Sequence, residues 1–270
     1  AVTLIVAGIQ TTSPYAVWPD TVPWLVANAV LALAGYFARS VNFSGAVGGF
    51  LLGAVLIFGG GWPLYVALLA FFVIGTTTTK LGYARKAKAG LAQEGGGRRG
   101  FSHAFSNVGV AAICAIAVSR VARSTHGATE LELVPLFMGI AALATAAADT
   151  TASEIGQWIG RRAFLPLTLR RVPVGTEGAI SVEGTLAGLA GGFAVALAGT
   201  LAVDRMFAEL VAFDWNTVAV LTLSAFAGSY LESILGSWNR KQVRPIPNGV
   251  LNFFNTAAGA ILFYVLYRWK

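Results

Sequence analysis

The stretch that decides the fold is LVPLFMGIAALATAAA, residues 133–148, which is followed at once by DTTASEIG, residues 149–156. The first part carries no charge and is close to the length that a tilted helix needs to cross about 30 Å of hydrocarbon. The second part places carboxylates and hydroxyls at its end. One ionised side chain at the centre of a membrane helix costs roughly 2.5–3.5 kcal/mol, and less near the helix end. The stretch therefore predicts a membrane helix that ends in a functional site.

Composition extends this prediction to the whole chain. Hydrophobic residues make up 56% of the 270 residues and charged residues only 11%. Such a chain cannot cover a water-soluble globule with polar surface, whereas it suits a bilayer. The single cysteine, Cys114, excludes an internal disulfide framework. We expect an all-α, polytopic integral membrane helix bundle that forms a single transmembrane domain over residues 1–270.

Eight apolar runs follow one another along the chain, each near the length of a tilted spanning helix. They cover residues 22–38, 43–59, 62–79, 103–119, 133–148, 179–203, 216–236 and 249–267. Residues 1–9 are apolar but too short to span, and we interpret them as a clipped first helix or a re-entrant piece rather than a signal peptide. The sequence thus predicts seven to eight transmembrane helices.

Basic residues set the expected topology. Of the 19 Lys and Arg residues, 14 follow the odd-numbered runs: Arg39, Lys80, Arg85, Lys86, Lys88, Arg98, Arg99, Arg161, Arg162, Arg170, Arg171, Arg240, Lys241 and Arg244. The opposite side has Arg120, Arg123, Arg205, Arg268 and Lys270. The positive-inside rule then places loops of about 80–102, 149–178 and 237–248 in the cytoplasm and both termini outside. Because the net charge of +7 comes from short loops, nucleic acid is not an expected partner.

Asp149, Ser153 and Glu154 are the first candidates for chemistry. Asp149 and Ser153 share a helix face, and Glu154 lies one residue further round. Oxygen ligands without nearby His or Cys favour Mg²⁺, which uses one or two carboxylates together with substrate phosphates. The alternative is that Asp149 caps a helix that begins near Thr150.

The segment QEGGGRRG, residues 93–100, is the second candidate. Glycines allow a backbone to approach phosphates closely, and Arg98 and Arg99 offer forked donors that match phosphate oxygens. The segment lacks the P-loop pattern. The alternative is a flexible loop whose cations contact lipid headgroups.

Other polar residues in apolar runs have two interpretations each. Glu183 and Glu232 are either ligands or partners in hydrogen bonds between helices, and Asn252 and Asn255 fit the second role. His103 is interpreted as an interfacial residue, because phosphoryl transfer to an ionised phosphate needs no proton abstraction. Small residues four apart predict close helix contacts at Gly45, Gly49 and Gly53 and at Gly184, Gly188 and Gly192.

From about residue 40 to 265 the chain resembles the transmembrane protein 19 family of integral membrane proteins. The resemblance lies in Phe71-Phe72 to Thr79-Lys80, Arg98-Arg99, Asn107 to Gly109, Asp149-Thr150 with Ala152-Ser153-Glu154 and Gly156, Val172-Pro173 with Gly175-Thr176, Gly178, and Ser181 with Gly184-Thr185. More distantly, the acidic-hydroxyl cluster followed by Glu-Gly-Thr resembles CTP-dependent polyprenol kinases and lipid cytidylyltransferases. Three positions depart from the family pattern: Val108, Glu232 in place of Asp, and Gly249 in place of an acid.

The resemblance implies a function, since a plant plastid member of the family is phytyl-phosphate kinase, which acts in tocopherol synthesis. It supports as site candidates Lys80, Arg98, Arg99, Asn107, Asp149, Ser153, Glu154, Glu183 with its neighbours Gly184 and Thr185, and Asn252. Asp149 and Glu154, with Glu232, would hold Mg²⁺.

The expected protein is a membrane kinase that transfers a phosphoryl group from a nucleoside triphosphate, CTP by resemblance, to an isoprenyl monophosphate such as phytyl phosphate. It would lie in a bacterial or archaeal cell membrane or a plastid membrane, with its catalytic face cytoplasmic or equivalent. A second copy of the chain, in a homodimer, is a candidate partner. Two alternatives stay open. One is a CTP-dependent lipid-phosphate cytidylyltransferase, and the other is an ion-coupled transporter.

Overall fold

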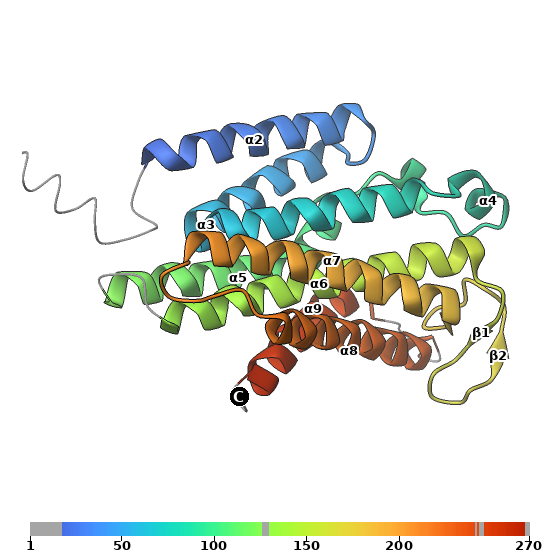
Figure 1. Cartoon of the computed structure of the whole chain (residues 1–270). Coiled ribbons are helices and arrows are strands. Elements are labelled where there is room, and N and C mark those ends of the chain that lie inside the picture. Colours follow the sequence, from blue (N-terminus) through green and yellow to red (C-terminus); the bar gives the residue numbers. More distant parts are fainter. Residues whose placement is uncertain (1–17, 126–129, 241, 243–245, 268–270) are drawn as a thin grey trace, which may run out of the picture.

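The structure, a computed structural model, describes residues 18–125, 130–240, 242 and 246–267. Its elements are α2 (Trp18–Phe37), α3 (Phe43–Lys80), α4 (Tyr83–Lys88), the 3₁₀ helix η1 (Glu94–Gly97), α5 (Phe101–Thr125), α6 (Glu130–Ile159), β1 (Ala163–Phe164), β2 (Arg171–Val172), β3 (Ile180–Ser181), α7 (Val182–Met206), α8 (Trp215–Asn239) and α9 (Asn248–Tyr267). Figure 1 shows the helices packed as a bundle. The expected all-α fold is confirmed. The apolar segment 1–9 and the basic residues Lys241, Arg244, Arg268 and Lys270 lie outside the described residues.

Helix α3 is two expected spans joined by a sharp turn. Gly61, inside α3, has φ 70° and ψ −170°, a backbone conformation that only glycine adopts readily. Both ends of α3 reach the same residue, because the Asn42 N–H donates to Arg99 O (3.1 Å) and Arg99 Nη2 donates to Gly75 O (3.4 Å). Figure 1 shows the chain reversing between the light-blue first half and the cyan second half. The runs 43–59 and 62–79 therefore form a hairpin, as the sequence predicts.

Among the described residues, six helices, α3 included, are long and apolar enough to cross a membrane, and Thr21–Phe37 is a shorter apolar helix. With α3 folded back on itself, these helices match the eight expected runs. α6 lies at the centre and packs against α3, α5, α7, α8 and α9. Its Ala-rich run from Ile140 to Ala148 is buried almost completely. The stretch quoted first is thus the core of the bundle.

Glycines on α7 allow the closest helix contact. A Cβ atom added at Gly184 would lie 2.7 Å from Ala152 O, and one at Gly188 would lie 3.0 Å from Ala148 O. Only a residue without a side chain fits at such distances, so the predicted small-residue contact is confirmed for α7 and α6. Gly49 on α3 differs, because a Cβ there meets nothing within 4 Å.

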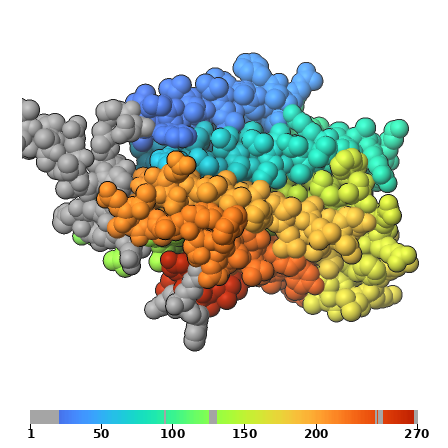
Figure 2. Space-filling view, viewed as in Figure 1, coloured from blue at the N-terminus to red at the C-terminus, as the bar shows by residue number. Residues whose placement is uncertain are grey.

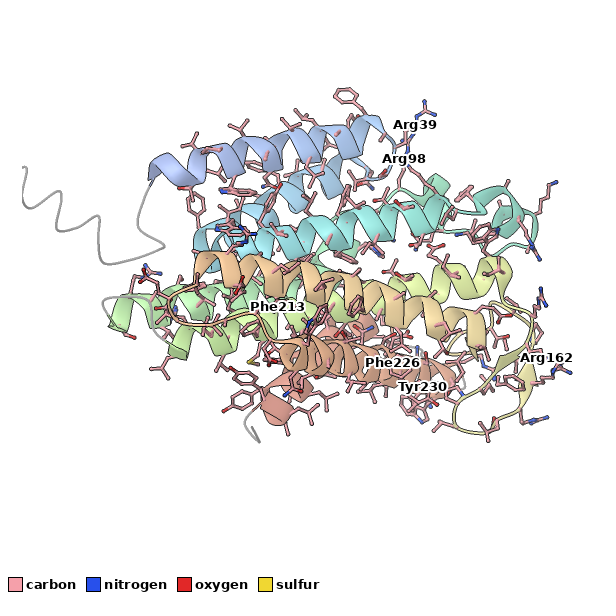
Figure 3. The ribbon with its side chains drawn as sticks, viewed as in Figure 1. Arg39, Arg98, Arg162, Phe213, Phe226 and Tyr230 are labelled. Carbon is pink, nitrogen blue, oxygen red and sulfur yellow. The ribbon has the colours of Figure 1, made fainter. Side chains whose placement is uncertain are left out.

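The segments expected in the cytoplasm gather at one end of the bundle. The turn after α2, helix α4 and the strands β1 and β2 share that end in Figure 1, and Figure 2 shows residues 160–181 (yellow) as a rim there. Arg39, Arg98 and Arg162 lie at the same end in Figure 3. Helix α6 continues to Ile159, so the expected loop of 149–178 begins only at residue 160.

Residues 160–181 form a small antiparallel sheet with the strand order β2-β1-β3. Ala163 on β1 is paired with Val172 on β2 and with Ser181 on β3. Ser181 is also the N-cap of α7 and accepts the Gly184 N–H at 3.1 Å. The sheet therefore fixes where α7 begins, next to the end of α6.

Candidate functional site

A cavity of about 270 Å³ lies between α6, α7, α8 and the segment 174–181. We call it the acidic cavity. Its polar lining consists of Asp149, Ser153, Gln157, Thr176, Glu177, Ser181, Thr185, Ser229, Glu232, Ser233 and Asn248, and Gly184 contributes backbone. Of the residues predicted from the sequence, the structure brings five to this cavity: Asp149, Ser153, Gly184, Thr185 and Glu232. They come from three helices that are far apart in the sequence.

Asp149 lies within α6 and does not begin a helix. The helix is continuous from Glu130 to Ile159, so the capping interpretation is wrong. Asp149 is 8% exposed, and the fully buried Asn255 of α9 lies beside its carboxyl group. Ser153 is one turn further along the same face and lines the cavity with it. Asp149 is therefore a buried carboxylate inside a membrane helix, where its charge is costly unless something binds it.

Two further carboxylates line the cavity together with Asp149. Glu232 comes from α8 and lies within electrostatic range of both Asp149 and Glu177. Glu177 is held in place by Asn239, whose Nδ2 donates to Glu177 Oε1 (3.4 Å) and to Ile246 O (2.9 Å). Asn239 thereby links the segment 174–181 to the end of α8 and the start of α9.

Among the described residues that line the acidic cavity there is no Lys, Arg or His. The three carboxylates therefore lack a cationic side chain at the cavity wall. Within the described parts of the chain, no three His, Cys, Asp or Glu side chains are close enough to form a metal site by themselves. Two carboxylates with open space beside them fit an ion that takes its other ligands from water or from a phosphate.

The first turn of α7 lies at the rim of this cavity, where Gly184 and Thr185 line it. The N-terminus of a helix carries a partial positive charge, which favours phosphate. The Gly184 N–H is already bonded to Ser181 Oγ, so the donor that this turn offers to the cavity is the Thr185 hydroxyl. Gly178, with φ +70°, presses the preceding loop against α8, where an added Cβ would be 2.1 Å from Ser237 N. The loop thus closes one side of the cavity.

Glu154 lies on a different face of α6 and does not line the acidic cavity. It forms a buried ion pair with Lys86 of α4 and accepts a hydrogen bond from Thr79 Oγ1 (3.0 Å). Thr79 Oγ1 in turn accepts from Arg99 Nη2 (2.8 Å). The structure therefore does not bring Asp149 and Glu154 to one ion, as the sequence interpretation expected, because five residues on a helix turn about 140°.

Lys86 is a residue that the sequence reasoning grouped only with the basic loop. It is 1% exposed, and its ammonium group also donates to Thr78 O (3.3 Å) and Thr79 O (3.0 Å), the last carbonyls of α3. Helix α4 has only six residues, which is too short for a pattern of apolar residues to indicate that Lys86 is buried. Sequence reasoning also missed Glu177. This residue lies in a loop, and the motif that the sequence shows there consists of its neighbours Gly175, Thr176 and Gly178.

A second polar pocket lies between the turn after α2, the end of α3, the start of α4 and the end of η1. It has a volume of about 270 Å³ and is lined by Arg39, Lys80 and Arg99 together with Ser40, Thr76, Thr79, Tyr83, Gly96 and Gly97. We call it the basic pocket. Burial lowers the pKa of the Arg99 guanidinium, and the Glu154 carboxylate opposes this shift. Arg98 is exposed and points away from the bundle in Figure 3, so the two adjacent arginines have separate environments.

The remaining predicted residues lie outside both pockets. Asn107 is 1% exposed, donates from Nδ2 to His103 O (2.8 Å) and leaves Oδ1 without a partner among the described residues. Asn252 is half-buried on α9. Glu183 is half-buried in the first turn of α7, where its charge favours the helix N-terminus.

Comparison with known proteins gives the family. The profile described as "Integral membrane protein DUF92" matches residues 26–258. "Uncharacterized membrane protein sll0875" of Synechocystis sp. is 35% identical over 89% of this chain and 90% of its own length. "Protein VTE6, chloroplastic" of Arabidopsis thaliana is 30% identical over 97% of this chain and 76% of its own length. "Uncharacterized membrane protein MJ0933" of Methanocaldococcus jannaschii is 28% identical over 88% of this chain and 90% of its own length.

No solved structure matches the chain. The family match covers most of the sequence, and the apolar helices of the bundle agree with its description. This integral membrane protein belongs to the family described as integral membrane protein DUF92.

Proposed function

We propose that the protein is a membrane-embedded kinase that transfers a phosphoryl group from a nucleoside triphosphate, CTP by resemblance, to an isoprenyl monophosphate such as phytyl phosphate. The observation that carries the proposal is the acidic cavity, where Asp149 and Glu232 lie near the N-terminus of α7 and the described lining residues include no cationic side chain. The resemblance to the transmembrane protein 19 family, whose plastid member is phytyl-phosphate kinase, supports it. The 30% identical chloroplast protein VTE6 supports it further.

Asp149 and Glu232 would hold Mg²⁺, with Ser153 as a neighbouring oxygen ligand. Bound Mg²⁺ neutralises negative charge on the donor phosphates and orients them. A site with two carboxylates suits this ion, because Mg²⁺ usually keeps several waters and takes substrate phosphates as further ligands. Glu154 has no part in this site, because Lys86 neutralises it.

The chain's own residues bind and orient the phosphates. The Thr185 hydroxyl donates a hydrogen bond to a phosphate oxygen at the cavity rim, and the partial positive charge at the N-terminus of α7 favours the phosphate there. The segment 174–181 covers the cavity and limits the access of water, which would otherwise compete as an acceptor. An isoprenyl monophosphate is already ionised, so the transfer requires positioning and charge neutralisation but no general base.

The proposal is tested with purified protein in lipid nanodiscs, Mg²⁺, each nucleoside triphosphate and phytyl or geranylgeranyl phosphate. Mass spectrometry of the lipid product separates the alternatives. An isoprenyl diphosphate supports the kinase, whereas a cytidylyl lipid with released pyrophosphate would replace it with the cytidylyltransferase. Absence of any lipid product, with ion-driven uptake into vesicles, would replace it with the transporter.

Asp149→Asn and Glu232→Gln should each lower the rate by a factor of about 100 or more, because they keep shape and remove charge. The matched control is Asp204→Asn on the last turns of α7. Asp204 Oδ1 accepts the Phe213 N–H (2.8 Å), a bond that Asn keeps. Mg²⁺ should raise the thermal stability of the wild type and of the control, but not of the two cavity variants. Wild-type rates and an unchanged Mg²⁺ response in both cavity variants would refute the metal site.

A further inference from the structure

A narrow apolar groove runs between α2, α3 and α5. It has a volume of about 80 Å³, and most of its wall is aliphatic, aromatic or glycine, including Leu31, Ala46, Gly49, Leu52, Leu68 and Phe72. Gly49 leaves open space at this wall, because a Cβ there meets no atom within 4 Å. The groove therefore has room for a short part of one hydrocarbon chain.

One end of the groove is cationic. Arg99 lines both this apolar groove and the basic pocket, so the two spaces adjoin at this residue. Arg39 and Lys80 add positive charge in the basic pocket. His103 also lines the groove, and its buried Nε2 has no hydrogen-bond partner among the described residues. A molecule that fits both spaces has a hydrocarbon chain and an anionic head.

The groove lies at the edge of the bundle. α2 packs mainly against α3 and lies on the outside of the molecule in Figure 1. Asn28 holds α2 there by donating from Nδ2 to Phe50 O (2.9 Å), and it also lines the groove. A lipid chain can therefore reach the groove sideways from the bilayer, without passing through water.

We propose that the groove and the basic pocket together bind a single-chain isoprenyl monophosphate, with its phosphate at Arg99, Arg39 and Lys80 and the first part of its chain in the groove. This inference rests on the proposed function and identifies where its lipid substrate binds. A phospholipid with two acyl chains does not fit a groove of this size. The rest of the isoprenyl chain extends into the bilayer.

The lipid phosphate in this position lies close to the acidic cavity. A Cβ added at Gly75 would be 2.9 Å from Arg99 Nη1 and 3.6 Å from Thr150 Cγ2, so Arg99 and Thr150 are neighbours. Thr150 directly follows Asp149, which lines the acidic cavity. Arg99 therefore links the two sites: it lines the basic pocket and is a neighbour of the α6 residue that follows Asp149.

The test measures lipid binding without nucleotide, so that it does not depend on turnover. A geranylgeranyl phosphate analogue with a diazirine on the isoprene unit next to the phosphate is irradiated with the protein in nanodiscs. We expect cross-links within residues 28–52 and 68–108, from the groove walls. Unlabelled geranylgeranyl phosphate should prevent them, and phosphatidic acid and inorganic phosphate should not. Equal competition by phosphatidic acid, or cross-links confined to α7–α9, would overturn the inference.

Two pairs of variants sharpen the test. Gly49→Phe fills the groove and should weaken binding of the analogue at least 10-fold, whereas Val47→Phe on the exposed face of the same helix should not change it. Arg99→Lys loses the forked donor and should weaken binding several-fold, whereas Arg98→Lys at the exposed neighbour should be silent. Wild-type binding in both Gly49→Phe and Arg99→Lys would remove the groove as the lipid site.

The inference and the proposed function can fail separately. Cross-linking in the groove that is sensitive to Gly49→Phe, without formation of any lipid product, keeps the binding site and refutes the kinase. Formation of the diphosphate at the wild-type rate and affinity in Gly49→Phe keeps the kinase and refutes the groove.

Discussion

The change Glu154→Gln is expected to destabilise the protein, because it leaves the Lys86 ammonium group buried without its counter-ion. In the structure the two side chains form an ion pair between α6 and α4, with Lys86 1% and Glu154 3% exposed. Gln keeps an acceptor for the Thr79 hydroxyl, so the loss is the charge alone. If Glu154 were instead a Mg²⁺ ligand, the same variant would fold normally and lose its Mg²⁺ response.

Breaking a buried ion pair from one side typically costs about 3–5 kcal/mol. We expect the low end of this range for Glu154→Gln, because Lys86 keeps its hydrogen bonds to the last carbonyls of α3. Lys86→Met should cost more, since it removes those bonds and leaves a buried carboxylate. The double variant has no buried charge, and its cost is about 1 kcal/mol for each carbonyl that loses its donor. It should therefore be more stable than either single variant.

The assay is the free energy of unfolding from a denaturant titration in mixed micelles, followed by tryptophan fluorescence. The control is Glu183→Gln, a half-buried carboxylate at the start of α7, which should lose only about 0.3–1 kcal/mol of helix-dipole interaction. Two results together would refute the role of the ion pair. Glu154→Gln would be as stable as the Glu183→Gln control, and the Glu154→Gln, Lys86→Met double variant would be less stable than both single variants.

Two further predictions concern topology and packing. Ala89→Cys, on the exposed loop after α4, should react with an impermeant maleimide only from the cytoplasmic side. The native Cys114 is buried and should give no background labelling. Labelling of Ala89→Cys from outside intact cells would show that the topology is the reverse of the predicted one. Gly188→Leu should lower the free energy of unfolding by about 1–3 kcal/mol, because the new side chain forces α7 away from α6. Gly49→Leu should leave the stability unchanged, because open space surrounds Gly49. Thermal unfolding measures both, and equal stability of the two variants would contradict the packing argument.

The sequence predicted the membrane bundle because the hydrophobicity of a segment and the turn-forming residues at its ends are local properties. An apolar run such as residues 133–148 must be helical in lipid, since its backbone polar groups have no other partners there. Gly61 lies between the predicted runs 43–59 and 62–79, and the structure places the turn of the α3 hairpin at this residue. The close contact of α7 with α6 was likewise readable from the spacing of its glycines.

The candidate site was predicted only in part. Asp149 and Ser153 share the acidic cavity, as their spacing of four residues indicates. Glu154 was grouped with them by nearness in sequence, although a separation of five residues already directs it to another face of the helix. Arg98 and Arg99 were treated alike, and only the fold distinguishes an exposed arginine from one that contacts Gly75 and Thr79.

The sequence by itself determined the number of helices, their membrane character and the side on which their charges gather. The tertiary structure alone decided that Glu177 and Glu232 share a cavity with Asp149, and that Lys86 neutralises Glu154. The physical reason is that transfer into lipid depends on each segment's own composition, whereas the partner of a buried charge depends on which faces of neighbouring helices meet. Those faces are selected by packing between residues far apart in the chain, for which a single sequence carries no local signal.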